Sequence, residues 1–315
     1  NFNFMPFFCI IIPLFNKEKF LKATLESVFE QTFSDFEILV INDGSTDKSL
    51  EIVESIQHKK IKIYNQKNQG VSAARNLGIE KSTSDYCCFL DADDIWKPNH
   101  LESLFQLIQK FPDAGLYCNR YEIQISKNKI ISTTFEFGNS HEGYINDFFK
   151  SSLVNRIALT SACCISKKTY HEIQGFDTEI TNGEDLDYWI RIALKYKIAI
   201  SNQNTLIYNF RTDNQSISKI NIEKQKLPNL EKYHSEEKQN PSLKRFLDLY
   251  RIEYALHFHI CGNTNKKKFY LKNVAKENIN PKTKLLLRTP SILLEKMLFT
   301  KRFLKQFGID FSVYH

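Results

Sequence analysis

A short apolar run that ends abruptly in carboxylates constrains the fold of this chain most strongly. Residues 86–90 read YCCFL, and the next four residues read DADD. A continuous apolar run of this length predicts a strand that is buried on both faces. In open α/β sheets, ligands bind beyond the carboxyl ends of the strands, so Asp91 and Asp93 are candidates to bind a divalent cation beside a diphosphate. A solvated acidic turn before the next helix is the alternative interpretation of this motif alone.

The first ninety residues alternate between apolar runs and segments with helical periodicity. Strands are predicted at 7–12, 36–41, 61–64 and 86–90, with helices at 17–30, around 50–56 and at 71–81. Because the connections are short, this alternation predicts a mostly parallel sheet flanked by helices. Asp43 and Asp91 each follow a strand end, so the topology should bring them to the same rim of the sheet.

The remainder of the chain divides into a mixed segment and a helical tail. Helices are predicted at 98–110 and 183–196, a hairpin at 121–125 and 129–135, and strands at 115–119, 160–165, 198–200 and 206–210. Beyond about residue 220 the pattern is helical and basic, without strand signals. We therefore expect an α/β domain over residues 1–219 and a helical C-terminal extension over residues 220–315.

Several function classes are disfavoured by missing motifs. The first strand is followed neither by GxGxxG, the dinucleotide fingerprint, nor by GxxxxGK[ST], the P-loop. Seven cysteines, an odd number without a CxxC pair, lie mostly in apolar runs, which favours buried free thiols in a reducing, cytoplasmic compartment. Every apolar stretch is too short to span a membrane.

Six motifs together resemble the inverting family 2 glycosyltransferases, which have the GT-A fold. They are IIIPLFN (residues 10–16), QTFSDFEILVINDGSTD (31–47), GVSAARNLGI (70–79), FLDADDIWKP (89–98), GFD (175–177) and GEDLDYWIRI (183–192). They occur in the family's order over about residues 7–218. The resemblance implies a Rossmann-like, mostly parallel sheet and a GT-A catalytic domain. It also implies transfer of a sugar from a UDP-sugar to a glycan or lipid-linked saccharide in surface polysaccharide biosynthesis, with Mn²⁺ or Mg²⁺ as the cofactor.

The resemblance implies a role for each matched residue. Pro13 and Asp43 are implied to bind the base, and Arg75 the diphosphate. Asp91 and Asp93 are implied to hold the ribose and the metal. The other implied contacts of the nucleotide sugar are Asn16, Ala92, Glu184 and Arg211. Asp213 stands where many relatives have a histidine, so its metal-binding role departs from the family pattern.

Asp185 is implied to be the base that deprotonates the acceptor hydroxyl. Its predicted place at a helix N-terminus weakens it as a base, because the helix dipole stabilises the carboxylate. Each site residue also has a structural interpretation. The Glu184–Asp185 pair can cap a helix, Arg75 can form a surface ion pair, and Asp43 can shape a turn. The alternative function is a catalytically inactive protein that binds nucleotide sugars or glycans. A nucleotidyltransferase is a weaker alternative, since no basic glycine-rich loop follows the first strand.

The positive charge of the chain is concentrated near its C-terminus. The formal net charge is +7. Residues 266–305 hold twelve basic and two acidic residues, a net +10, so the rest of the chain carries −3. Leucines cluster with these lysines at helical spacing between residues 280 and 307. Such a basic amphipathic helix either lies on an anionic membrane surface, here the inner face of the cell membrane, or packs on the catalytic body with a solvated face. Nucleic-acid binding is not expected, because no known module accompanies the basic run.

Overall fold

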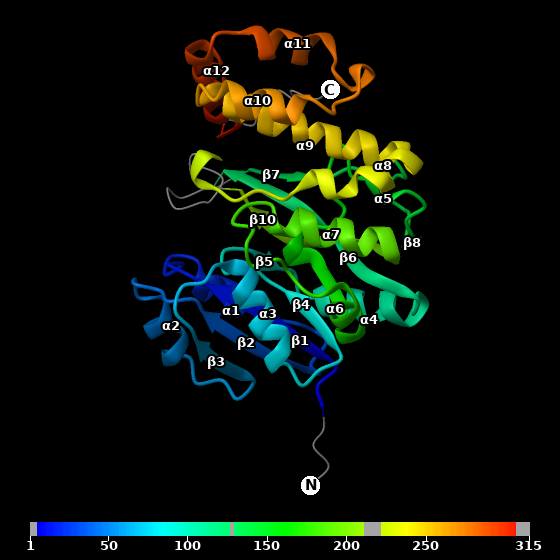
Figure 1. The fold of residues 1–315 in the computed structure, drawn as a ribbon. Coiled ribbons are helices and arrows are strands. Elements are labelled where there is room, and N and C mark those ends of the chain that lie inside the picture. The colour runs from blue at the N-terminus through cyan, green and yellow to red at the C-terminus, as the bar shows by residue number, and fades with distance from the viewer. Residues whose placement is uncertain (1–4, 127–128, 211–221, 307–315) are drawn as a thin grey trace. The chain divides into compact units, whose positions relative to one another are not determined.

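The computed structural model describes residues 5–126, 129–210 and 222–306 (Figure 1). Contacts between residues divide the chain into two compact units. Unit 1 comprises residues 1–124 and 130–209, and unit 2 comprises residues 125–129 and 210–315. Unit 1 is a mixed α/β structure and unit 2 is mainly helical, as the sequence pattern predicts.

Unit 1 is built on one ten-stranded sheet. The strands are β1 (Phe8–Leu14), β2 (Phe36–Asn42), β3 (Ile61–Asn65), β4 (Tyr86–Phe89), β5 (Ile95–Trp96), β6 (Ala114–Ser126), β7 (Lys129–Ser132), β8 (Gly143–Tyr144), β9 (Cys163–Ser166) and β10 (Lys197–Asn209). Their order is β3-β2-β1-β4-β9-β6-β10-β5, with β7 beside β6 and β8 beside β10. The first four strands pair in parallel, whereas β9 runs antiparallel between β4 and β6.

The parallel half of the sheet forms the core and determines where the strands end. Every residue of β2 is buried, as is almost all of β1, because helices cover both faces of these strands. In the pairing of β1 with β2, Leu14 lies opposite Asn42. The backbone N–H of Asp43 then donates to the carbonyl of Leu14 over 2.8 Å. The carboxyl ends of β1 and β2 therefore meet at one rim of the sheet.

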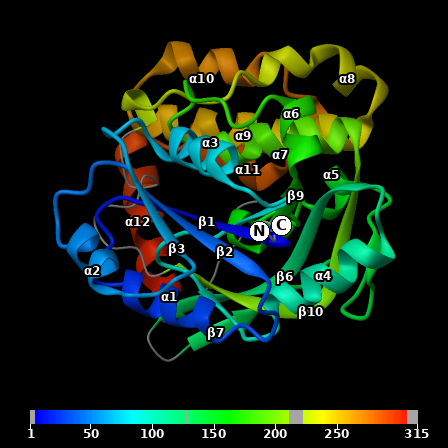
Figure 2. The same cartoon turned by 90° about the horizontal axis from the view of Figure 1, so that it is seen from below.

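Helices flank both faces of this sheet. Those of unit 1 are α1 (Leu21–Phe29), α2 (Ser49–Ser55), α3 (Val71–Lys81), α4 (His100–Lys110), α5 (Phe148–Ser151), α6 (Lys167–Ile173) and α7 (Glu184–Lys195). Figure 2 shows α3, α6 and α7 on one face, and α1 and α4 on the other. On the first face, Asn76 of α3 donates to the carbonyl of Phe176, in the loop that leads to α7.

Two strands are longer than their sequence patterns predict. The predicted strands at 198–200 and 206–210 form a single strand, β10, and those at 115–119 and 121–125 form β6. The register of β10 against β6 shifts between Ile200 and Asn204, and again before Leu206. The polar residues of this irregular stretch interrupt the apolar pattern, yet Ser201 and Thr205 are buried and hydrogen-bonded. The short strand β5 has no counterpart among the predictions.

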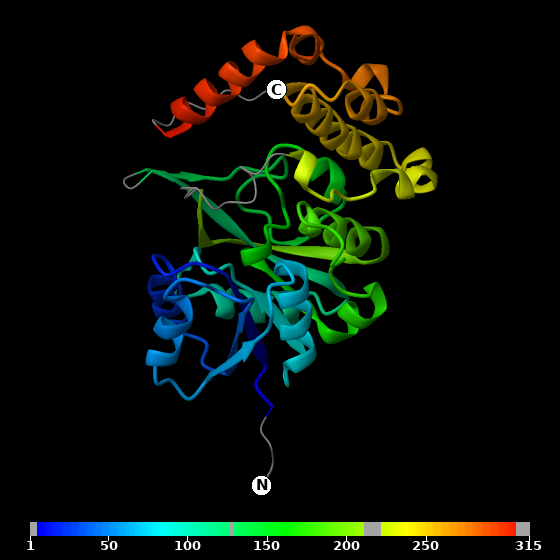
Figure 3. The same ribbon diagram turned by 60° about the vertical axis from the view of Figure 1, so that its left-hand side comes forward.

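Unit 2 is organised around one long helix. Its helices are α8 (His234–Gln239), α9 (Pro241–Ile260), α10 (Thr264–Leu271), α11 (Pro281–Arg288) and α12 (Ser291–Gln306), and α10, α11 and α12 all contact α9 (Figure 3). None of the helices that the structure describes is long and apolar enough to cross a membrane.

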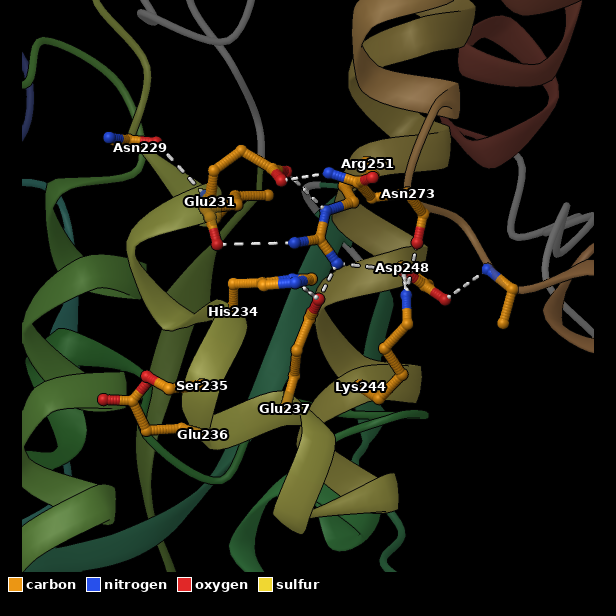
Figure 4. A network of polar contacts seen from close by, with 12 residues as sticks. Asn229, Glu231, His234, Ser235, Glu236, Glu237, Lys244, Asp248, Arg251 and Asn273 are labelled. Carbon is orange, nitrogen blue, oxygen red and sulfur yellow. Dashed lines mark hydrogen bonds and ion pairs between the residues drawn. The ribbon is translucent and has the colours of Figure 1, made fainter.

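A buried ionic network in unit 2 connects α9 with α8, with the segment before α8 and with the segment after α10 (Figure 4). Arg251 of α9 is fully buried, and it donates to Glu237 over 2.7 Å and to Glu231 and Asp248 over 3.0 Å each. Asp248 also accepts from the backbone N–H of Ala275. These bonds satisfy the buried charges and fix the segment after α10 against α9.

Candidate functional site

Asp43 binds the start of α3 from the carboxyl end of β2. Its Oδ1 accepts from Gln66 Nε2 over 2.7 Å and from the N–H of Gln69 over 2.8 Å. Its Oδ2 accepts from the N–H of Gly70 over 2.9 Å. Gly70 has φ +90°, a left-handed conformation that favours glycine, and α3 begins at the next residue. A carboxylate has about four acceptor positions, so three bonds leave room for about one more.

Pro13 and Asn16 lie beside Asp43 at the end of β1. Pro13 pairs with Ile41 in the sheet register. Asn16 has φ +53°, and its side-chain oxygen accepts from the N–H groups of Thr46 and Asp47 over 2.8 and 3.3 Å. The carboxamide of Asn16 thus fixes the loop that follows Asp43. The expected contact of Asn16 with a nucleotide stays a prediction.

Arg75 joins two parts of the sequence that lie far apart. Its Nη2 donates to Asp91 Oδ1 over 2.8 Å, and its Nη1 donates to Glu184 Oε1 over 2.9 Å. The arginine is 3% exposed, so this is no surface ion pair. Its Nε is buried and has no hydrogen-bond partner among the described residues. Arg75 therefore brings the DADD turn and the start of α7 into one cluster.

The charges of this cluster perturb each other. Burial alone would lower the pKa of Arg75, but the negative charges of Asp91 and Glu184 outweigh it and raise the pKa. Glu184 behaves differently, because burial and then the adjacent charge of Asp185 raise its pKa despite the contact with Arg75. A permanent cation among crowded carboxylates is an arrangement typical of functional sites.

A buried serine, Ser161, fixes the DADD turn through two hydrogen bonds. Asp94 is 1% exposed, and its Oδ2 accepts from the hydroxyl of Ser161 over 2.6 Å. The same hydroxyl oxygen accepts from the N–H of Asp91 over 3.1 Å. The other oxygen of Asp94 accepts from the N–H of Asn209 over 2.9 Å. Asp94 and Ser161 thus connect the turn, the short 3₁₀ helix at 160–162 and the end of β10.

Asp91 and Asp93 offer the donor chemistry that Mg²⁺ or Mn²⁺ requires. Asp91 and Asp93 lie on either side of buried Ala92. Burial of Asp94 is the largest cause that raises the pKa of Asp94, and the negative charges of Asp93 and Asp91 raise it further. One or two carboxylates suffice for such a cation when substrate phosphates complete its shell. Lys17 already pairs with Asp93 over 2.6 Å. Among the described residues, no three side chains of His, Cys, Asp or Glu are grouped so that they could hold one metal ion together. The predicted third ligand, Asp213, and the predicted contact Arg211 lie outside the described residues.

Asp185 lies in the first turn of α7, next to Glu184. Its side chain is 19% exposed, and its Oδ1 accepts from the N–H of Leu186 over 2.7 Å. Its Oδ2 lies 3.4 Å from Nη1 of Arg156. The N-cap residue of α7 is Gly183, and no side chain caps this helix, so the interpretation of the Glu184–Asp185 pair as a helix cap is wrong. Asp185 bonds the N–H of the next residue and remains partly accessible.

Four residues of the cluster were not predicted from the sequence. Lys17 and Arg156 each contact a predicted site carboxylate, and Asp94 and Ser161 support the turn. Asp94 belongs to the DADD motif, and its burial could have been suspected because it directly precedes an apolar pair. Lys17 and Ser161 lie in a predicted helix and a predicted strand, but neither pattern marks them as site residues, and Arg156 lies outside every predicted element.

A mixed α/β sheet with a carboxylate cluster at its strand ends places the chain in the structural class of the GT-A nucleotide-sugar enzymes. Within this class, the chain belongs to glycosyl transferase family 2, whose sequence profile matches residues 9–169. The predicted family is thereby confirmed.

Several known proteins with similar sequences are much longer than this chain. An uncharacterized glycosyltransferase of Rickettsia bellii is 29% identical over 231 residues, which cover 71% of this chain and 32% of the relative. Chondroitin synthase of Escherichia coli is 26% identical over 248 residues, covering 70% of this chain and 34% of the relative. The chain thus spans about a third of the length of these relatives.

Among solved structures, that of S. aureus TarS 1-349 in complex with UDP-GlcNAc is similar, with a TM-score of 0.62 and 16% sequence identity. The match covers 93% of this chain and 92% of that chain. At this identity the likeness establishes the fold, and it confirms the predicted fold class, helical C-terminal region included.

Proposed function

We propose that this protein is an inverting glycosyltransferase that transfers a sugar from a UDP-sugar to a saccharide acceptor. The observation that carries this proposal is the bridge by Arg75 between Asp91 and Glu184. It brings the residues expected to hold the donor to within one residue of the expected base, Asp185. Family membership supports the reaction class.

The donor is expected to bind along the rim formed by β1, β2 and β4. Asp43 has about one acceptor position left, which suits the single imide N–H of uracil. Arg75 retains unused N–H donors, including its buried Nε, and these suit the oxygens of a diphosphate. The similar TarS structure is a complex with UDP-GlcNAc, which supports a UDP-sugar donor. A bound cation, held by Asp91 and Asp93, would neutralise charge on the departing diphosphate.

The reaction that we propose is an in-line displacement at the anomeric carbon. The acceptor oxygen forms a bond to this carbon while the bond to the diphosphate oxygen breaks, and UDP leaves with the electron pair. The acceptor proton passes to Asp185. Arg156 and the N–H of Leu186 hold the carboxylate in place. We expect the proton to be transferred late, after the bond between the acceptor oxygen and the anomeric carbon has largely formed.

The acceptor is expected to be a glycan or a lipid-linked saccharide of a surface polysaccharide. Support comes from the similarity to a chondroitin synthase. We also infer that the protein works as a peripheral protein at the inner face of the cell membrane, where lipid-linked acceptors are present.

The experiment that tests this function is a turnover assay with a panel of UDP-sugars, with and without Mn²⁺, by release of UDP. We expect turnover of at least one donor. Asp185→Asn should lower kcat by roughly a hundredfold or more, the usual contribution of a general base, while UDP affinity stays unchanged. Asp113→Asn, at an exposed carboxylate away from the cluster, is the matched control. UDP binding without turnover of any donor would instead identify a catalytically inactive binding protein.

A further inference from the structure

Three consecutive helices of unit 2 share a pattern in their sequences. In each, a large apolar residue has a basic residue three positions before it and another three positions after it in the sequence. The sets are Lys266, Phe269 and Lys272 in and after α10, Lys282, Leu285 and Arg288 in α11, and Lys296, Phe299 and Arg302 in α12. Residues three apart lie on the same side of a helix, so each apolar residue is flanked by positive charge.

The apolar residues of this pattern are largely exposed to solvent. Phe299 is 72% exposed, Leu285 is 67% exposed and Phe269 is 56% exposed. Ile292 is 71% exposed and lies two turns before Phe299, on the same face of α12. Isolated exposed apolar residues are common in proteins, but this repeated combination with lysine and arginine is not explained by packing.

The opposite faces of α11 and α12 pack on α9. Leu286 and Leu294 are buried in a cluster with Ile252 and Leu256 of α9. The exposed faces of α11 and α12 therefore point away from the core of unit 2. We call these two faces, with Leu285, Ile292 and Phe299 and their flanking basic residues, the tail face.

We propose that the tail face binds the surface of an anionic lipid bilayer. Between residues 281 and 300 the chain has four basic residues and one acidic residue, Glu295, which complements the charge of such a surface. The apolar side chains would enter the boundary between head groups and acyl chains, while the lysine and arginine heads contact lipid phosphates. This inference deepens the proposed location and rests on that part of the proposed function.

Other occupants fit these side chains less well. A second copy of the chain would bring like charges together, since each apolar residue carries basic neighbours. A nucleic acid would use the basic residues, but Ile292 and Leu285 have no aromatic ring on which a base could stack. A bilayer uses both kinds of side chain.

The test is co-sedimentation of the full chain with vesicles of phosphatidylcholine alone and with vesicles that contain about a third of phosphatidylglycerol. We expect binding to the anionic vesicles only, and weaker binding in high salt. Ile292→Gln with Phe299→Gln should lower the partition coefficient by about tenfold or more. Arg288→Gln and Lys296→Gln should each lower it by about fivefold, and Glu295→Gln should raise it. Val154→Gln, at an apolar residue of unit 1 that is 54% exposed, is the matched control.

Two kinds of result would overturn the proposal. One is equal binding to neutral and anionic vesicles, or no loss of binding in the double variant relative to the Val154 control. The other is a dimer, or a complex with single-stranded RNA, that forms through the tail face while vesicles are not bound. Release of UDP from a UDP-sugar in solution should be unchanged in the double variant. Failure of vesicle binding is thereby distinguished from failure of sugar transfer.

Discussion

Replacing Arg75 by methionine should destabilise unit 1 in a pH-dependent manner. Methionine has a similar length and leaves no large cavity, but it removes both ion pairs of the cluster. Breaking a buried ion pair from one side costs about 3–5 kcal/mol, because the remaining charge stays buried. Asp91 is 34% exposed and can be solvated, whereas Glu184 is only 12% exposed. We therefore expect the lower end of this range, about 3 kcal/mol near pH 8.

The penalty should shrink as the pH falls. Burial and the charge of Asp185 already raise the pKa of Glu184, and loss of Arg75 removes a charge that lowers it. A carboxyl group whose pKa is higher in the folded state than in the unfolded state contributes stability at low pH, which is lost as the pH rises through the folded pKa. Protonated Glu184 needs no cation, so the variant should lose less stability at pH 5.5 than at pH 8.

The assay is urea unfolding followed by tryptophan fluorescence. The chain has two tryptophans, Trp96 and Trp189, and both are buried in unit 1, so the signal reports this unit alone. The double variant Arg75→Met with Glu184→Gln should recover much of the lost stability, because no unpaired buried charge remains. Equal stability of wild type and single variant at pH 8, or a further loss in the double variant, would refute the reasoning.

Three further predictions follow from buried groups and the turn. Burial holds the pKa of His100 at about 3, below its value in the unfolded chain. The free energy of unfolding should therefore fall by about 2 kcal/mol between pH 7 and pH 5. His100→Gln should remove this loss in the fluorescence assay. Ser161→Ala should weaken UDP binding in the presence of Mn²⁺, measured by calorimetry. Ser27→Ala, which removes the buried acceptor of the backbone N–H of Trp96, should not weaken it. Asp93→Asn should weaken Mn²⁺ binding by roughly tenfold or more in an electron paramagnetic resonance titration, and an unchanged affinity would contradict its role as a ligand.

The order of elements was predictable because the pattern in the first ninety residues is strong. Four apolar strands with short connections leave few topologies, and the strand ends necessarily gather their polar residues. The proximity of Asp43 to the end of β1 follows from that topology. The helical character of the C-terminal part was predictable from its lack of strand signals and from the leucine spacing after residue 280, but the bounds of its helices were not predicted.

Contacts made by residues outside any motif were not predictable. The pairing of Lys17 with Asp93 and of Arg156 with Asp185 depends on loop conformations that no periodicity encodes. The ion pairs of Arg75 require α3 and α7 to lie on the same face of the sheet, and a helical pattern does not specify the face. The length of β10 was missed because buried polar residues broke the apolar pattern, although their hydrogen bonds are satisfied inside the protein.

The most direct test of the proposed transfer is the anomeric configuration of the first product. Slow hydrolysis of an α-linked UDP-sugar can be followed by proton NMR from the first minutes, before the released sugar equilibrates in solution. A single displacement assisted by Asp185 predicts that the β anomer appears first and that Asp185→Asn slows its formation by roughly a hundredfold or more. Initial release of the α anomer, or an undiminished rate in the variant, would contradict the account.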